Sequence, residues 1–209
     1  VDAANQQNIR INGRPITFKV VTQDDRSDLR TSALVAEYLV KRGVVGVIGH
    51  GSTGNSMAAA PIYAKAGIPL LAPSASGRSY TQQGFATSFR LLGHSDAGGS
   101  YLGAYVAATL GVKRIAVIDN GTPSGRAFAD SFVASAKSHD VSIISRDTIS
   151  DKTSDFNSVL VNARTNNADA IFWGGLTDQA IILALNMHRM NLPMRLISGA
   201  NGLISGIFI

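Results

Sequence analysis

The chain has 209 residues, of which 45% are hydrophobic and 16% are charged, and it contains no cysteine. This apolar content excludes a disordered chain, and no window of about 18 residues is apolar enough to predict a membrane span. The lack of cysteine excludes a disulfide scaffold, a thiol nucleophile and cysteine-ligated zinc. The formal net charge of +5 reflects scarce acids, since Glu37 is the only glutamate, rather than a basic patch. Nucleic acid and anionic membrane surfaces are therefore not expected partners.

Short apolar runs alternate with amphipathic stretches along the chain. The turn signal Asn12-Gly13 precedes the first expected strand, and Ser27 or Asp28 is suited to cap the helix that follows it. Strands are expected over residues 16–21, 44–48, 68–72, 87–91, 114–119, 141–146, 168–173 and 194–198. Helices are expected over residues 28–42, 55–66, 101–110, 126–138, 155–165 and 178–190, with the end of another at residues 1–7.

From residue 114 onward the expected strands begin about every 26 residues, which favours parallel strands joined by crossover helices. We therefore predict an α/β protein with two doubly wound parallel-sheet lobes, both incomplete in this chain. Turn-forming residues gather at 93–99, so lobe I is expected over residues 1–95 and lobe II over residues 96–209. The length suggests a fragment of a two-lobed protein, with exposed sheet edges through which it could associate with another chain. No leader segment precedes Val1, which carries no information about export.

Two hydroxyl-rich loops follow neighbouring apolar strands. Residues 49–55 offer free backbone N–H groups, the positive end of a helix dipole, and the hydroxyls of Ser52 and Thr53. Residues 73–77 add Ser74 and Ser76 after the next strand. Because ligands bind at the carboxyl ends of parallel strands, the two loops predict a site for a carboxylate or a phosphate. The alternative is that these hydroxyls only cap helices and turns.

Other motifs give weaker signals. The glycine spacing of residues 49–54 fits a dinucleotide fingerprint, but the next strand ends without the acid that would hold a ribose. No nucleophile elbow and no histidine pair at metal-ligand spacing is present. We therefore expect no catalysis, no cofactor and no metal.

The titratable residues support the same interpretation. His50 and His94 fall in the candidate loops, with no evident acid–base partner beyond Asp96. Asp24 and Asp25 follow the first expected strand and are interpreted as part of a solvated loop at a helix start.

A series of short segments, each occurring once, stands in a specific order along nearly the whole chain. They are residues 20–25 with Asp28, 47–53, 66–69, 72–76, 80–81, 89–93 with Asp96, 117–120 with Ser124-Gly125, 169–172 with Gly174-Gly175, and 199–202. No single segment is diagnostic. Together they resemble the periplasmic binding proteins of the leucine/isoleucine/valine type, which are the solute receptors of branched-chain amino acid ABC importers.

The resemblance implies two lobes that close on a small ligand without catalysis, and loops of lobe I that hold its carboxylate. The implied ligand-binding positions are Gly51, Ser52, Thr53, Ser74, Ala75 and Ser76 in lobe I, Ser95 and Asp96 at the crossover, and Ser124, Thr177 and Asn201 in lobe II. It also implies a periplasmic or other extracytoplasmic location, a monomeric receptor, and an ABC permease in the membrane as partner.

Three positions depart from the family's pattern, one of them Gly98, which stands where a glutamine is common. Members that bind amino acids usually have an aromatic residue where Ser124 stands, and often an acid where Asn201 stands. A neutral amide cannot supply the charge that pairs with an α-ammonium group. A branched-chain amino acid and a related organic or aromatic acid are therefore both retained as ligands. The alternative functions are a ligand-sensing domain of a receptor or regulator and, further away, an α/β enzyme with a nucleotide or acyl substrate.

Overall fold

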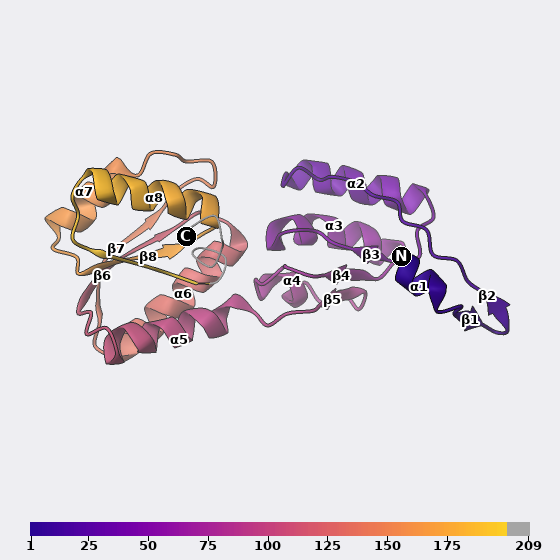
Figure 1. Ribbon diagram of the computed structural model, residues 1–209, viewed down its shortest axis with the longest axis horizontal. Helices are drawn as coiled ribbons and strands as arrows, with labels where there is room; N and C mark the ends of the chain where they lie inside the picture. Colours follow the sequence, from indigo (N-terminus) through magenta and orange to yellow (C-terminus); the bar gives the residue numbers. More distant parts are fainter. Residues whose placement is uncertain (200–209) are drawn as a thin grey trace.

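The computed structural model describes residues 1–199, which form two α/β lobes side by side (Figure 1). Lobe I contains α1 (Asp2–Gln6), β1 (Arg10–Ile11), β2 (Arg14–Pro15), α2 (Leu29–Lys41), β3 (Val47–Ile48), α3 (Thr53–Lys65), β4 (Leu70–Ala72), α4 (Ser79–Gln82) and β5 (Ser88–Arg90). Lobe II contains α5 (Ser95–Ala108), β6 (Arg114–Asp119), α6 (Pro123–Ser138), β7 (Ser142–Thr148), α7 (Asn157–Thr165), β8 (Ala170–Gly174), α8 (Thr177–Arg189) and β9 (Arg195–Ser198). The predicted α/β class with parallel sheets is confirmed.

Lobe II is a four-stranded parallel sheet in the order β7-β6-β8-β9, covered by helices on both faces (Figure 1). Alternation along β6 and β8 divides its core in two. Val117 and Phe172 pack beneath α5 and α6, where the Phe172 ring stacks on Phe132. Ile118 and Trp173 point to the opposite face, beneath α7 and α8. Because both faces are covered, these strands are apolar nearly throughout, which is why sequence patterning located them well.

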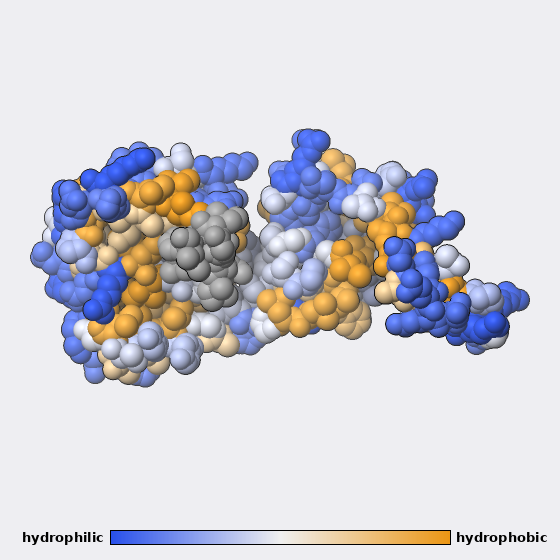
Figure 2. Space-filling view, viewed as in Figure 1, coloured by the Kyte–Doolittle hydropathy of each residue, from blue (hydrophilic) through white to orange (hydrophobic). Residues whose placement is uncertain are grey.

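Lobe I has a smaller parallel sheet in the order β3-β4-β5. Helices α2 and α3 cover one face (Figure 1), and their core is centred on Tyr63, Leu70 and Tyr80. On the other side, Ile48 is 80% exposed and Phe89 is 50% exposed. Apolar residues accordingly reach the surface of this lobe (Figure 2). The apolar run at 44–48 suggested a strand covered on both faces, which is wrong, and the expectation of exposed sheet edges stays a prediction.

The strand expected over residues 16–21 is not formed, although the Asn12-Gly13 turn before it closes the β1–β2 hairpin. A strand needs a hydrogen-bonded neighbour, whereas residues 18–25 line a cavity of about 1100 Å³ together with residues 42–51. The stretch is linked instead to α1, where Asn5 bonds both backbone groups of Phe18, and to Ile9, whose carbonyl accepts from Ile16 N–H at 2.9 Å. A β-branched sequence alone is therefore not sufficient to form a strand.

The start of α5 differs from the expected crossover at 93–99. The helix begins at Ser95, within the segment expected to form turns. The glycines that suggested turns instead allow a close contact between α5 and α6. A Cβ at Gly99 would lie 2.4 Å from the carbonyl oxygen of Phe128, and one at Gly103 would lie 2.8 Å from that of Phe132. Helix α7 also begins later than expected, at Asn157, with no side-chain cap from Ser154. Among the described residues, no helix combines the length and apolar character that crossing a bilayer requires.

Candidate anion-binding site

The loop of residues 49–55, here called the anion loop, connects β3 to α3. Gly49 has a φ of +151°, which L side chains rarely adopt, so glycine suits the turn out of the strand. Ser52 is the extended N-cap of α3, and its Oγ accepts from Asn55 N–H at 3.2 Å and donates to Asn55 Oδ1 at 2.7 Å. Within the described part of the chain, the N–H groups of residues 51–54 donate to no protein acceptor. Free amides at the positive end of a helix dipole attract anions.

The loop of residues 73–77, here called the serine loop, lies directly against the anion loop. Ser74 Oγ donates to the carbonyl of Gly51 at 3.0 Å, and Gly77 N–H donates to Thr53 Oγ1 at 2.8 Å. Thr53 is 1% exposed, so its hydroxyl joins the two loops rather than lying open to solvent. Ala75 and Ser76 are also buried. The structure therefore brings together the lobe I residues named by sequence, with Ser52 and Ser74 nearer the surface.

The start of α5 is attached to the serine loop. The carbonyl of Ser76 accepts from Ser95 N–H at 2.9 Å and from Ser95 Oγ at 3.4 Å. Asp96 forms an ion pair with Arg78 Nε at 2.9 Å, and Arg78 also lies 3.2 Å from His94 Nε2. Asp96 is thus engaged with lobe I, and these contacts anchor the first turn of α5 to the lobe I side of the crossover.

Lobe II places its candidate residues at the switch point of the sheet, where the chain winds outward from β6 to β7 and from β8 to β9. Ser124 Oγ lies 3.5 Å from Thr122 Oγ1, which caps α6 by accepting from Gly125 N–H at 3.1 Å. Thr177 is the first residue of α8 and is half-buried. Asn201 lies outside the described residues.

The N-termini of α3 and α6 approach each other across the two lobes. A Cβ built on Gly54 of α3 would lie 3.8 Å from the Pro123 ring, the first residue of α6. Two positive helix ends therefore meet where the lobes face each other, which favours a negatively charged group between them.

A buried pair that the sequence reasoning missed supports the anion loop. His50 is 6% exposed, and its Nδ1 lies 2.6 Å from Asp25 Oδ2, while its Nε2 lies 3.5 Å from Tyr63 OH. The interpretation of Asp25 as a solvated loop residue is therefore wrong. The two residues lie 25 positions apart, and no local pattern signals such a contact.

The surroundings shift the pKa values of Asp25 and Tyr63. Partial burial by itself raises the pKa of the Asp25 carboxyl, but hydrogen bonds from His50, from Ser27 N–H and from Asn55 outweigh it and hold that pKa below its usual value. Burial, with a contribution from the negative charge of Asp25, raises the pKa of Tyr63 to about 12. Elsewhere in residues 1–199, no cluster of histidine and acidic side chains could hold a metal ion.

Comparison with known proteins identifies the family of this chain. The model of a protein family described as periplasmic binding protein matches residues 1–203. The chain belongs to the periplasmic binding protein family. It is 30% identical over 195 residues to the Leu/Ile/Val-binding protein homolog 1 of Brucella abortus, a match covering 93% of this chain and 52% of that one. The chain thus spans about half the length of the curated relatives it matches.

Solved structures of transporter substrate-binding and solute-binding proteins share the fold. One is the branched-chain amino acid transporter substrate binding protein LivJ of Streptococcus pneumoniae in complex with isoleucine, with a TM-score of 0.81 and 24% identity over 96% of this chain and 56% of that one. Another is an ABC transporter solute binding protein of R. palustris in complex with benzoate, with a TM-score of 0.82 and 20% identity over 95% of this chain and 55% of that one. Both match the parallel sheets and lobes described above.

Proposed function

We propose that this chain is part of an extracytoplasmic solute-binding protein of an ABC importer, which binds a small carboxylate between its lobes. The observation that carries this proposal is the row of N–H groups at residues 51–54, which have no acceptor in residues 1–199 and lie at the positive end of α3 beside the serine loop. A carboxylate would accept from these N–H groups without needing a positively charged side chain. Loops near Ser124, Thr177 and Asn201 would contact the rest of the ligand.

The chemical class of the ligand is proposed as an aliphatic amino acid or an aromatic acid with one carboxylate. Related structures carry isoleucine and benzoate, which share only that group. The anion loop would recognise the shared carboxylate, and lobe II would distinguish the remainder. The protein would release its ligand unchanged to a membrane permease.

Calorimetric titration with L-isoleucine and benzoate, each matched to its neutral amide, tests the proposal directly. We expect saturable binding of at least one carboxylate, at least about tenfold weaker binding of its amide, and an unchanged ligand by NMR after incubation. Equal binding of acid and amide would contradict the carboxylate site. Formation of a product would instead favour an α/β enzyme.

A further inference from the structure

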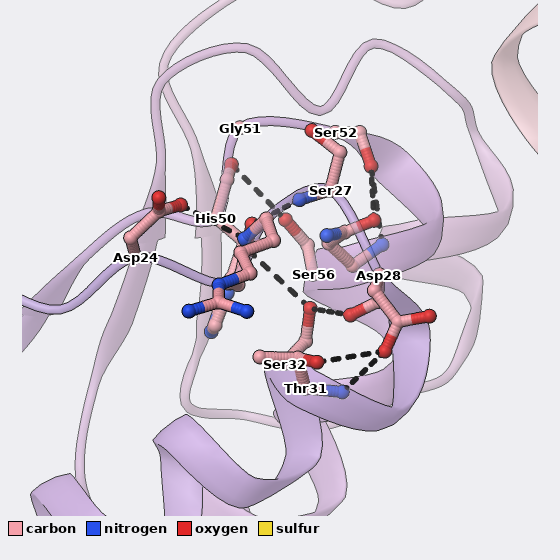
Figure 3. A network of polar contacts seen from close by, with 12 residues as sticks. Asp24, Ser27, Asp28, Thr31, Ser32, His50, Gly51, Ser52 and Ser56 are labelled. Carbon is pink, nitrogen blue, oxygen red and sulfur yellow. Dashed lines mark hydrogen bonds and ion pairs between the residues drawn. The ribbon is translucent and has the colours of Figure 1, made fainter.

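His50 of the anion loop lies close to the start of α2, where Asp28 and Ser32 are found (Figure 3), and its Nδ1 contacts Asp25. Asp25 is fixed on the α2 side, where its Oδ1 accepts from Ser27 N–H at 2.9 Å and its Oδ2 accepts from Ser32 Oγ at 3.3 Å. Ser32 Oγ also donates to the carbonyl of Asp28, the N-cap of α2, at 2.9 Å. The carboxylate that meets His50 is therefore held by a helix start and not by a free loop.

The proton positions of the pair follow from the chemistry of its partners. An ionised Asp25 can only accept, so the short contact requires the hydrogen of His50 to be on Nδ1. Nε2 of the neutral ring is then an acceptor and faces the hydroxyl of Tyr63, which is a donor at neutral pH. The imidazole is thus bound on both edges, by α3 on one side and by the α2 start on the other.

The backbone carbonyl groups of His50 and Gly51 are held by two serine hydroxyls. The carbonyl of His50 accepts from Ser56 Oγ at 3.4 Å, and the carbonyl of Gly51 accepts from Ser74 Oγ at 3.0 Å. Both carbonyls are therefore engaged with protein donors, while the N–H groups that follow remain unpaired. Rotation of these peptide groups would exchange N–H for C=O at the anion site and repel an anion.

We propose that Asp25 and His50 are positioning residues for ligand binding, in which Asp25 holds the imidazole and His50 fixes the direction of the N–H groups of residues 51–54. Neither side chain touches the ligand. The inference rests on the proposed function of the anion loop, and it adds residues that determine how well the loop is preorganised. A preorganised loop binds more tightly because less ordering is needed on binding.

NMR of the chain tests the positioning without any ligand. In the wild type we expect His50 to show the Nδ1–H tautomer in long-range ¹H–¹⁵N spectra. Asp25→Ala should abolish that signature and shift the amide resonances of residues 51–54, and Asp25→Asn should do so less, because it retains an acceptor. Asp24→Asn is the matched control, since the neighbouring Asp24 bonds only Arg26 N–H in its own turn. Unchanged amide resonances in Asp25→Ala would overturn the proposal.

Binding of L-isoleucine and benzoate gives the second measurement. For whichever carboxylate the wild type binds, Asp25→Ala should lower the affinity on the order of tenfold. Ile115→Val, a buried truncation in lobe II, should lower Tm while leaving that affinity unchanged. If affinity falls with Tm to the same extent in Asp25→Ala and in Ile115→Val, Asp25 is merely structural. If the wild type binds neither carboxylate the proposed function fails, and the NMR result still decides the positioning.

Discussion

Thr53 and Gly77 hold the two loops of the candidate site in direct contact. The Gly77 N–H donates to Thr53 Oγ1 at 2.8 Å, and a Cβ at Gly77 would lie 2.7 Å from Thr53 Cγ2. The absence of a side chain at Gly77 is therefore what lets the serine loop lie against α3. The hydroxyl then fixes the register of the two loops, so the anion site depends on an interaction between a side chain and a backbone group of different elements.

Thr53→Val should destabilise the protein more than Thr53→Ser. Valine preserves the shape but leaves the buried Gly77 N–H without an acceptor, which costs about 1–3 kcal/mol. Serine keeps the acceptor and loses only a methyl group, which costs about 1 kcal/mol. Urea unfolding of both variants measures the difference. Equal free energies of unfolding for the two variants would show that the hydrogen bond contributes nothing.

Gly103→Ala should destabilise the protein by about 1–3 kcal/mol, although alanine is the better helix former. A Cβ at Gly103 would lie 2.6 Å from Ser135 Cβ and 2.7 Å from the backbone nitrogen of Ala136, so α5 would have to move away from α6. Gly98→Ala in the same helix is the control. Its Cβ would meet only Phe128 Cε2, at 3.4 Å, so that variant should be neutral or slightly stabilised by thermal unfolding.

The glycines of α5 illustrate what the sequence could predict. Strand β6 coincides with its predicted bounds and α2 lies within one residue of them, because apolar runs and caps act locally. Gly99 acts instead through its close contact with α6, and without knowledge of α6 it resembles a turn former. The same reasoning explains residues 16–21, whose β-branched sequence suits a strand but has no neighbouring strand to pair with among the described residues. Local patterns therefore located most elements and failed where a distant element decides.

The candidate site, like the fold, was predicted from the sequence only in part. The hydroxyl-rich loops were found because parallel strands bring their carboxyl ends to one edge, a rule that needs only the order of the elements. The engagement of Asp25 with His50 was not found, because it depends on how the start of α2 approaches the anion loop. Contacts that support a site are less visible in a sequence than the residues that form it.

Asp25→Asn should make the free energy of unfolding depend less on pH in the acid range. The folded-state pKa of Asp25 lies below its ordinary value of 3.8, so the ionised carboxylate stabilises the fold above about pH 4. That contribution is lost as the pH falls through the lowered pKa. Free energies of unfolding measured between about pH 7 and pH 2 should therefore decrease less steeply in the variant than in the wild type. Parallel curves would show that Asp25 titrates alike in the folded and unfolded chains.

Trp173, the only tryptophan of the chain, should report ligand contact with lobe II. Its ring is fully buried, and its Nε1–H donates to the carbonyl of Leu176 at 3.1 Å, directly before Thr177. Gly175 lies against the same ring, since a Cβ there would be 2.1 Å from Cζ2 of Trp173. Movement of the loop between β8 and α8 must therefore change the surroundings of the indole. We expect a bound carboxylate to shift the tryptophan emission in the wild type and Trp173→Phe to remove the signal. If calorimetry shows binding while the emission stays constant, the ligand does not contact this loop, and the prediction for Thr177 is wrong.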